Sequence, residues 1–181
     1  MTMQRRPTDI ENKLLLLYAI DRLGAVTAQQ LLLFMVENDF MGYISLQLGL
    51  AELDEAGLLR KQKHALGTLY ALTGKGRDAL SMFQRRVPHS RLSGIDEIAG
   101  DWRLRFRREK QMLADFQKKE NGEYLVRLRL LEREEHLLDL KLSVPTHDQA
   151  QRFCDAWIEQ AAGIYAHIMR ALGEDEKKPE K

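Results

Sequence analysis

A short basic stretch holds the side chains best suited to contact phosphate. The segment RKQKHALGTLYALTGKG starts at Arg60 and alternates polar with apolar residues on both sides of a glycine-containing connection. This pattern is typical of a β-hairpin. Cationic side chains near a hairpin tip can neutralise the phosphates of a nucleic acid, which dominate its nonspecific affinity for proteins. The candidate phosphate contacts are therefore Arg60, Lys61, Lys63 and His64.

The segment just before this hairpin holds candidate contacts to DNA bases. GYISLQLGLAELDEAG, residues 42–57, carries Leu46, Leu50 and Leu53 at three- and four-residue spacing, which predicts an amphipathic helix. When such a helix enters a major groove, its first turns meet the base edges, and glutamine can pair with adenine. The candidate base contacts are Tyr43, Ser45 and Gln47.

The same helix differs from a typical DNA-reading helix in its charge. It contains no lysine or arginine, and its acidic residues are Glu52, Asp54 and Glu55. A second apolar row, formed by Ile44, Leu48 and Ala51, lies roughly opposite the leucines. Such a row also fits a helix that packs against another subunit or against the second half of the chain. Contact with DNA and contact with protein therefore both stay open.

Four predicted helices and the hairpin set the context of these residues. The helices are predicted over 8–23, 26–39, 42–57 and 74–87, and the hairpin over 58–73. Three of the helices have a residue in position to cap the first turn, namely Thr8 or Asp9 in the first, Thr27 in the second and Thr73 in the fourth. The order helix, helix, helix, hairpin, helix is typical of a winged helix-turn-helix domain, which we predict over residues 8–87.

The second half of the chain is predicted to form a domain of its own over residues 96–172. The segment PHSRLSGIDEIAG, residues 88–100, contains Pro, Ser and Gly among polar residues and is predicted to hold the boundary. An amphipathic helix is predicted over 101–119. The charged end of the chain, residues 173–181, has the composition of a disordered tail.

A second hairpin and a long helix complete this domain. Alternation over 124–144 predicts two strands that place Leu130 opposite Leu138. A two-stranded sheet is marginal alone, so its apolar side needs a cover. A helix predicted over 146–172 can supply that cover with Phe153, Trp157, Ile164, Ile168 and Leu172. The predicted fold class is α+β, a winged helix-turn-helix followed by a helix, hairpin and helix unit.

Composition and missing motifs argue against several function classes. The 181 residues include 28 Lys and Arg against 27 Asp and Glu, so any nucleic-acid site must be local. One cysteine, Cys154, and no signal-peptide pattern favour a cytoplasmic protein, and no apolar run is long enough to span a membrane. The histidines lack zinc-ligand spacing, and TGKG lacks the first glycine of a phosphate loop. We therefore expect no enzyme activity, cofactor or metal.

Several separated motifs together resemble one bacterial family. The motifs are ENKLLLLYAIDRLG, VENDFMGYISLQLGLAELDEAGLL, YALTGKGRDAL and LDLKLSVPTHDQAQRFCDAWIEQAAGIYAHIM. In this order they resemble the domain-of-unknown-function family 4364, and the resemblance runs nearly end to end, from Asp9 to Leu172. It implies a winged helix with relatives among the PadR-like and MarR-like regulators, and it implies no ligand, operator or chemistry.

The sequence supports two hypotheses of function. The first is a transcriptional regulator that binds double-stranded DNA as a homodimer, with the second domain serving dimerisation or effector sensing. Residues that could line a pocket for a small-molecule effector, or simply pack in the core, are Tyr124, Trp157, Tyr165 and Met169. The second hypothesis is a noncatalytic protein-interaction module on a winged-helix scaffold, in which a partner covers Ile44 and Leu48.

Overall fold

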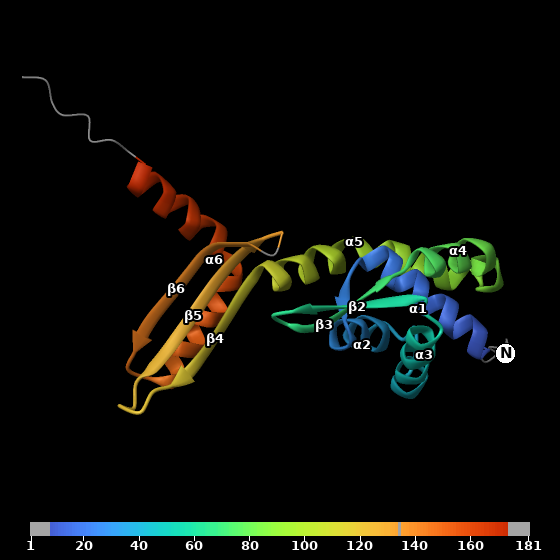
Figure 1. Ribbon diagram of the computed structural model, residues 1–181, viewed down its shortest axis with the longest axis horizontal. Helices are drawn as coiled ribbons and strands as arrows, with labels where there is room; N and C mark the ends of the chain where they lie inside the picture. The colour runs from blue at the N-terminus through green and yellow to red at the C-terminus, as the bar shows by residue number, and fades with distance from the viewer. Residues whose placement is uncertain (1–7, 134, 174–181) are drawn as a thin grey trace, which may run out of the picture. The chain divides into compact units, whose positions relative to one another are not determined.

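Two compact units make up the chain, and they divide after Phe106. The computed structural model describes residues 8–133 and 135–173, so the predicted tail beyond Gly173 lies outside the described residues. Within these ranges the protein is α+β, with six α-helices and two antiparallel sheets of three strands each (Figure 1). None of the helices in these ranges combines the length and the apolar character needed to cross a membrane.

Helices surround a small sheet in the first unit. Its elements are α1 (Asp9–Leu23), β1 (Val26–Thr27), α2 (Ala28–Glu37), α3 (Tyr43–Glu55), β2 (Leu59–His64), β3 (Gly67–Leu72), α4 (Gly74–Phe83), a 3₁₀ turn η1 (Gln84–Arg86) and α5 (His89–Gln111). The strand order of the sheet is β1-β3-β2. The three predicted threonine caps are confirmed at α1, α2 and α4.

Helix α1 lies at the centre of the core of this unit. Every residue of Leu14–Ile20 is buried, because α3, α4, β3 and η1 all contact the helix. A helix that is apolar on all sides belongs in a core, which explains the run LLLLYAI. The start of the helix is fixed by a capping box between Thr8 and Glu11.

The short strand β1 was not predicted from the sequence. Val26 pairs with Tyr70 and Thr27 with Leu69, so β1 adds a third strand to the hairpin. Thr27 has extended backbone angles because it is the N-cap of α2, and Val26 is fully buried. Two residues of extended chain between helices are too few to give an alternating pattern.

The TGKG segment fastens the start of α4 to the turn that follows α3. Thr73 Oγ1 accepts a hydrogen bond from the Gly76 N–H at 3.0 Å, and the Thr73 N–H donates to the Leu58 carbonyl at 3.0 Å. Lys75 Nζ donates to the Ala56 carbonyl at 2.9 Å. A Cβ on Gly76 would overlap the Leu58 carbonyl oxygen. The segment is therefore a helix cap and a close backbone contact.

The segment predicted to hold the domain boundary is helical. Helix α5 begins at His89 and runs through the segment without interruption. Gly94 lets the helix approach Phe40, because a Cβ there would lie 3.1 Å from Phe40 Cε1. Ile95 and Ala99 are buried in the core of the first unit. This packing carries the first unit to Phe106, beyond the predicted limit at residue 87.

The second unit is a three-stranded sheet covered by one helix. Its elements are β4 (Met112–Lys118), β5 (Tyr124–Glu132), β6 (Glu135–Val144) and α6 (His147–Gly173). The strand order is β4-β5-β6, so the predicted hairpin has gained a strand. The side chains between the sheet and α6 include Val126, Leu128, Cys154 and Trp157, all buried.

The helix predicted over 101–119 is wrong beyond Gln111, where β4 begins. Phe106, Leu113 and Phe116 fit a helical stripe, which is why the sequence favours a helix there. In the structure Met112 and Phe116 share the sheet face that packs on the second core, and β4 pairs with β5 along its length. Pairing with a neighbouring strand decides between two patterns that the residues allow equally.

The register of the β5–β6 hairpin is confirmed, with Leu130 opposite Leu138 and Arg129 opposite Asp139. The ion pairs of this sheet join diagonal neighbours on adjacent strands, and not residues that lie directly opposite each other. Asp139 binds Arg127 at 2.5 Å, and Arg129 binds Asp115 of β4 at 2.5 Å. The added strand supplies Asp115, which pairs with Arg129 in place of the directly opposite Asp139.

Most of the predicted cover from α6 is confirmed. Trp157 is fully buried, and its Nε1–H donates to the Arg129 carbonyl at 3.1 Å. Phe153 and Ile164 also pack against this core. Leu172, which was predicted on the same face, is 83% exposed because the last turn of α6 lies beyond the core contacts.

We expect Gly76→Ala to destabilise the first unit by about 1–3 kcal/mol, because the new Cβ overlaps the backbone of Leu58 and forces a shift. Native-state hydrogen exchange of the buried α1 amides measures this change in the free energy of unfolding. The matched control is Gly74→Ala, where a Cβ meets nothing within 4 Å. Equal protection in the two variants would contradict the close contact.

Candidate nucleic-acid interface

Packing against α1 determines which face of α3 is exposed. Leu46, Gly49, Leu50 and Leu53 form the buried side of α3. A Cβ on Gly49 would run into the Leu16 side chain of α1, so the two helices approach closely at this point. The predicted leucine stripe is thereby confirmed as the inner face. The opposite face of the helix is left in solvent.

The outer face of α3 carries the predicted base contacts and the second apolar row. Tyr43 is 58% exposed, Ile44 72% and Leu48 58%. Ser45 and Gln47 are exposed beside them, as is Ala51. Tyr43 and Gln47 therefore share one accessible side of α3, whereas Ser45, two residues from each of them, is exposed on a different side of the helix.

The predicted hairpin is confirmed as strands β2 and β3 joined by Ala65 and Leu66. Its tip is tight, with Gly67 at a φ of +112° and the Leu66 N–H donating to His64 Nδ1 at 3.2 Å. Glycine at this position avoids the strain that a side chain would bring. One ring nitrogen of His64 is thus used to hold the turn.

The four candidate phosphate contacts lie on two different faces of the hairpin. Lys61 is opposite Tyr70 and Lys63 opposite Thr68, so the two lysines share one face. Arg60 and His64 point to the other face by the same alternation. Lys61 contacts α3, so the lysine face is the one that adjoins α3. A ligand on α3 would meet the two lysines before Arg60 or His64.

Lys61 is held by an ion pair with Asp54 of α3. Its ammonium also lies 5.7 Å from the centre of the Tyr70 ring. The hydrogen bond with Asp54 is the main cause that raises the pKa of Lys61. A groove of about 220 Å³ at this contact is lined by Gln47, Asp54, Lys61 and Tyr70, among others. The structure thus brings one predicted base contact and one predicted phosphate contact to a single groove.

Asp54 and Tyr70 are the parts of this groove that sequence reasoning missed. From the sequence, Asp54 was interpreted only as a negative charge that is unfavourable to DNA binding. Tyr70 was interpreted only as a residue of the predicted hairpin. Their spacing from Lys61 in the sequence carries no signal, because Asp54 comes from a helix and Tyr70 from the paired strand. Lys63 and Arg60 form no ion pair with any residue in the described part of the chain.

The residues considered for an effector pocket in the second unit belong largely to its core. Trp157 is buried, and Tyr124 and Tyr165 pack partly against the same cluster. Met169 is half exposed on the last turns of α6. Cys154 is buried nearby, and this burial raises the pKa of its thiol, whereas a redox-reactive cysteine needs a lowered one.

One family model matches most of the chain. The family described as Domain of unknown function (DUF4364) matches residues 12–172. The chain belongs to this family. Neither the curated proteins nor the solved structures contained a match. The family assignment made from the sequence motifs is confirmed over nearly the same residues.

We expect Asp54→Asn to lower the pKa of Lys61 toward its ordinary value, because the carboxylate that stabilises the ammonium is removed. A ¹³C NMR titration of the Lys61 side chain measures this shift. Glu55→Gln is the matched control, since it removes an equal charge one residue away. A Lys61 pKa that stays raised in Asp54→Asn would show that the ion pair does not hold Lys61.

Proposed function

We propose that the first unit is a winged helix-turn-helix domain that binds double-stranded DNA, and that the protein is a transcriptional regulator. The observation that carries this proposal is the exposed outer face of α3 beside the lysine face of the β2–β3 hairpin. In winged helices these two elements are the ones that meet DNA. Here Gln47 lies on the helix and Lys63 on the hairpin.

The order of elements supports the winged-helix assignment. The first unit runs α1, β1, α2, α3, β2, β3, α4, and β1 closes the hairpin into a three-stranded sheet. This is the predicted arrangement of helices and wing with the small first strand added. In it α3 takes the place of the recognition helix and the loop Ala65–Leu66 the tip of the wing.

The charge on this surface fits weak, salt-sensitive binding. Lys63 is exposed on the lysine face and adds one positive charge that a phosphate can use, whereas Arg60 is exposed on the other face of the hairpin. Lys61 is already paired with Asp54, but the pair is at the surface. Exposed ion pairs contribute little to stability, so a phosphate can take over Lys61 at small cost. In this proposal the side chains that contact the DNA bases are Tyr43, Ser45 and Gln47.

The second unit suits dimerisation in this proposal. Helix α6 carries Ile158, Met169 and Leu172 as exposed apolar side chains. A homodimer would cover apolar surface of this kind and would present two copies of α3 to related half-sites. The proposal places the protein in the cytoplasm, where its single thiol stays reduced.

A noncatalytic protein-interaction module is the second candidate function. It is favoured by the exposure of Ile44 and Leu48 on a helix that has no lysine or arginine. Exposed apolar side chains that adjoin one another mark surfaces for protein partners. In this alternative a partner protein covers the same face of α3 that DNA would meet.

Fluorescence anisotropy on mixed-sequence duplex DNA across a salt series tests the proposal. Binding should weaken steeply as salt rises, because neutralised phosphates release counterions. Lys63→Gln should reduce the log–log salt slope by about 0.9, the value for one lost phosphate contact. Asp54→Asn should tighten binding, because it removes a negative charge and releases Lys61.

Lys118→Gln is the matched control, since Lys118 is an exposed lysine of β4 in the second unit. Its slope should equal that of the unsubstituted protein. A folded protein that binds no duplex at low salt would contradict the DNA proposal and favour the interaction module. Equal slopes for Lys63→Gln and Lys118→Gln would remove the hairpin from the interface.

A further inference from the structure

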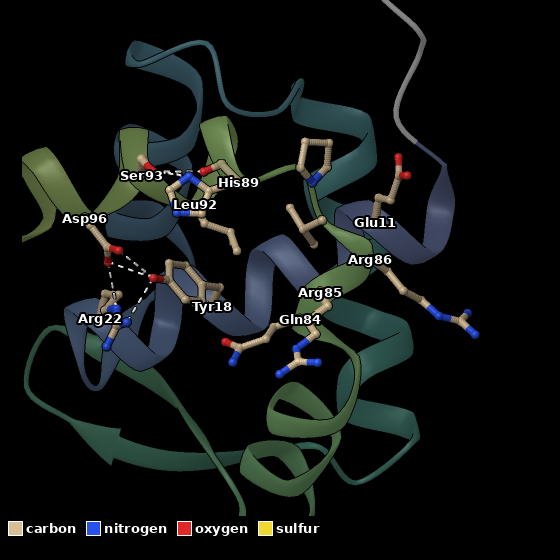
Figure 2. A pocket seen from close by; sticks show the side chains of 12 residues that line it. Glu11, Tyr18, Arg22, Gln84, Arg85, Arg86, His89, Leu92, Ser93 and Asp96 are labelled. Carbon is tan, nitrogen blue, oxygen red and sulfur yellow. Dashed lines mark hydrogen bonds and ion pairs between the residues drawn. The ribbon is translucent and has the colours of Figure 1, made fainter.

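A second hollow lies in the first unit, between α1, η1 and the first turns of α5. Its volume is about 620 Å³, which falls within the range typical of small-molecule sites. Its polar lining includes Gln84, Arg85 and His89, and its apolar lining includes Val87 and Leu92 (Figure 2). None of these residues belongs to the α3 and hairpin surface.

One wall of the cavity is a closed network of polar side chains. The Tyr18 hydroxyl lies 2.7 and 2.8 Å from the two Asp96 oxygens and donates to that carboxylate. Arg22 Nε donates to Asp96 Oδ1 at 2.8 Å, and Arg22 Nη2 donates to the Tyr18 oxygen at 2.9 Å. The charges of Arg22 and Asp96 therefore cancel locally, and this wall neither attracts nor repels an ion strongly.

Arg85 supplies the positive charge that this network does not cancel. It forms no hydrogen bond or ion pair with another residue in the described ranges. Figure 2 shows its side chain beside that of Gln84, whereas Arg86 points away from the other side chains that line the cavity. Arg86 stacks on the Phe83 ring, with 5.4 Å from its guanidinium carbon to the ring centre.

The remaining lining limits the charge that a ligand can carry. Glu11 lies at the rim, where its carboxylate accepts the Thr8 N–H at 2.8 Å in the capping box. A ligand with two separated negative charges would meet the Glu11 carboxylate with the second one. Pro88 is exposed and Leu92 half-buried, so these two residues offer a surface for a hydrocarbon body, whereas Val87 is buried in the cavity wall. The lining thus favours one negative group attached to an apolar body.

The start of α5 adds donors to the same side of the cavity. Pro88 and His89 line it at the N-terminal end of α5, where the helix dipole is positive. Ser93 Oγ donates to the His89 carbonyl at 3.0 Å and lies 3.0 Å from His89 Nδ1. These contacts hold the imidazole at the edge of the site.

We propose that this cavity binds a small organic monocarboxylate, with the carboxylate on Arg85 and the apolar body over Pro88 and Leu92. Guanidinium and carboxylate match in shape and can form two parallel hydrogen bonds. This makes the cavity an effector or metabolite site within the first unit, apart from the second unit where the sequence placed a pocket. The site stands whether or not the protein binds DNA.

Methyl ¹H–¹³C NMR of the full chain, titrated with benzoate, tests this proposal without DNA. Benzoate should shift the methyl signals of Val87 and Leu92, with a Kd on the order of 1 mM for so small a ligand. Benzamide has the same shape without the charge and should bind about 10-fold more weakly, and so should benzylamine, which is cationic.

Arg85→Gln should weaken benzoate binding about 10-fold, because it removes the charged partner of the carboxylate. Arg60→Gln is the matched control and should leave the Kd unchanged, since Arg60 is an exposed arginine of β2 that does not line the cavity. The proposal is overturned if benzoate shifts neither methyl group or if benzamide binds as tightly. An unchanged Kd in Arg85→Gln would also overturn it.

Discussion

The burial of α1 on all sides is the constraint on which the first unit depends. Seven consecutive residues, Leu14–Ile20, have no polar face to offer solvent, so neighbouring elements must enclose them. Helix α3 does so on one side with its leucines, which leaves Ile44 and Leu48 in water. The cavity uses the same helix, because Tyr18 and Arg22 reach from α1 to Asp96 on α5. One buried helix thus determines where both candidate surfaces lie.

The acidic residues of α3 and the basic residues of the hairpin interact with each other. In the free protein the Lys61 ammonium is paired with the Asp54 carboxylate. Part of the positive charge of the hairpin is therefore neutralised until a phosphate replaces Asp54. Because the pair is exposed, its dissolution costs little, and a phosphate near Lys63 would be close to Lys61 as well. A helix without lysine or arginine is therefore compatible with a DNA interface in which the hairpin supplies the charge.

Local patterns predicted much of the fold, and tertiary contacts decided the remainder. The three threonine caps, the leucine stripe of α3 and the pairing of Leu130 with Leu138 follow from periodicity and capping rules. Residues after Gln111 fit a helix and a strand equally well, and only pairing with β5 selects the strand. Gly94 suggested a linker, yet its role is a close approach to Phe40, which no local pattern reveals.

In the candidate surfaces too, local patterns predict some features and tertiary contacts decide the others. The positions of Gln47 and Lys63 follow from a helix and a hairpin that the sequence predicts. The Lys61–Asp54 pair and the Tyr18–Arg22–Asp96 network depend on which elements meet in space. Tyr18 and Asp96 are 78 positions apart, so no spacing rule could join them.

Hydrogen–deuterium exchange of the full chain, with and without duplex DNA, locates the residues that DNA covers. We expect slower exchange at the first turns of α3 and in the β2–β3 hairpin, with α6 and the α1–α5 cavity unchanged. Slower exchange only elsewhere in the chain, with α3 and the hairpin unchanged at a DNA concentration that saturates the protein, would contradict this expectation.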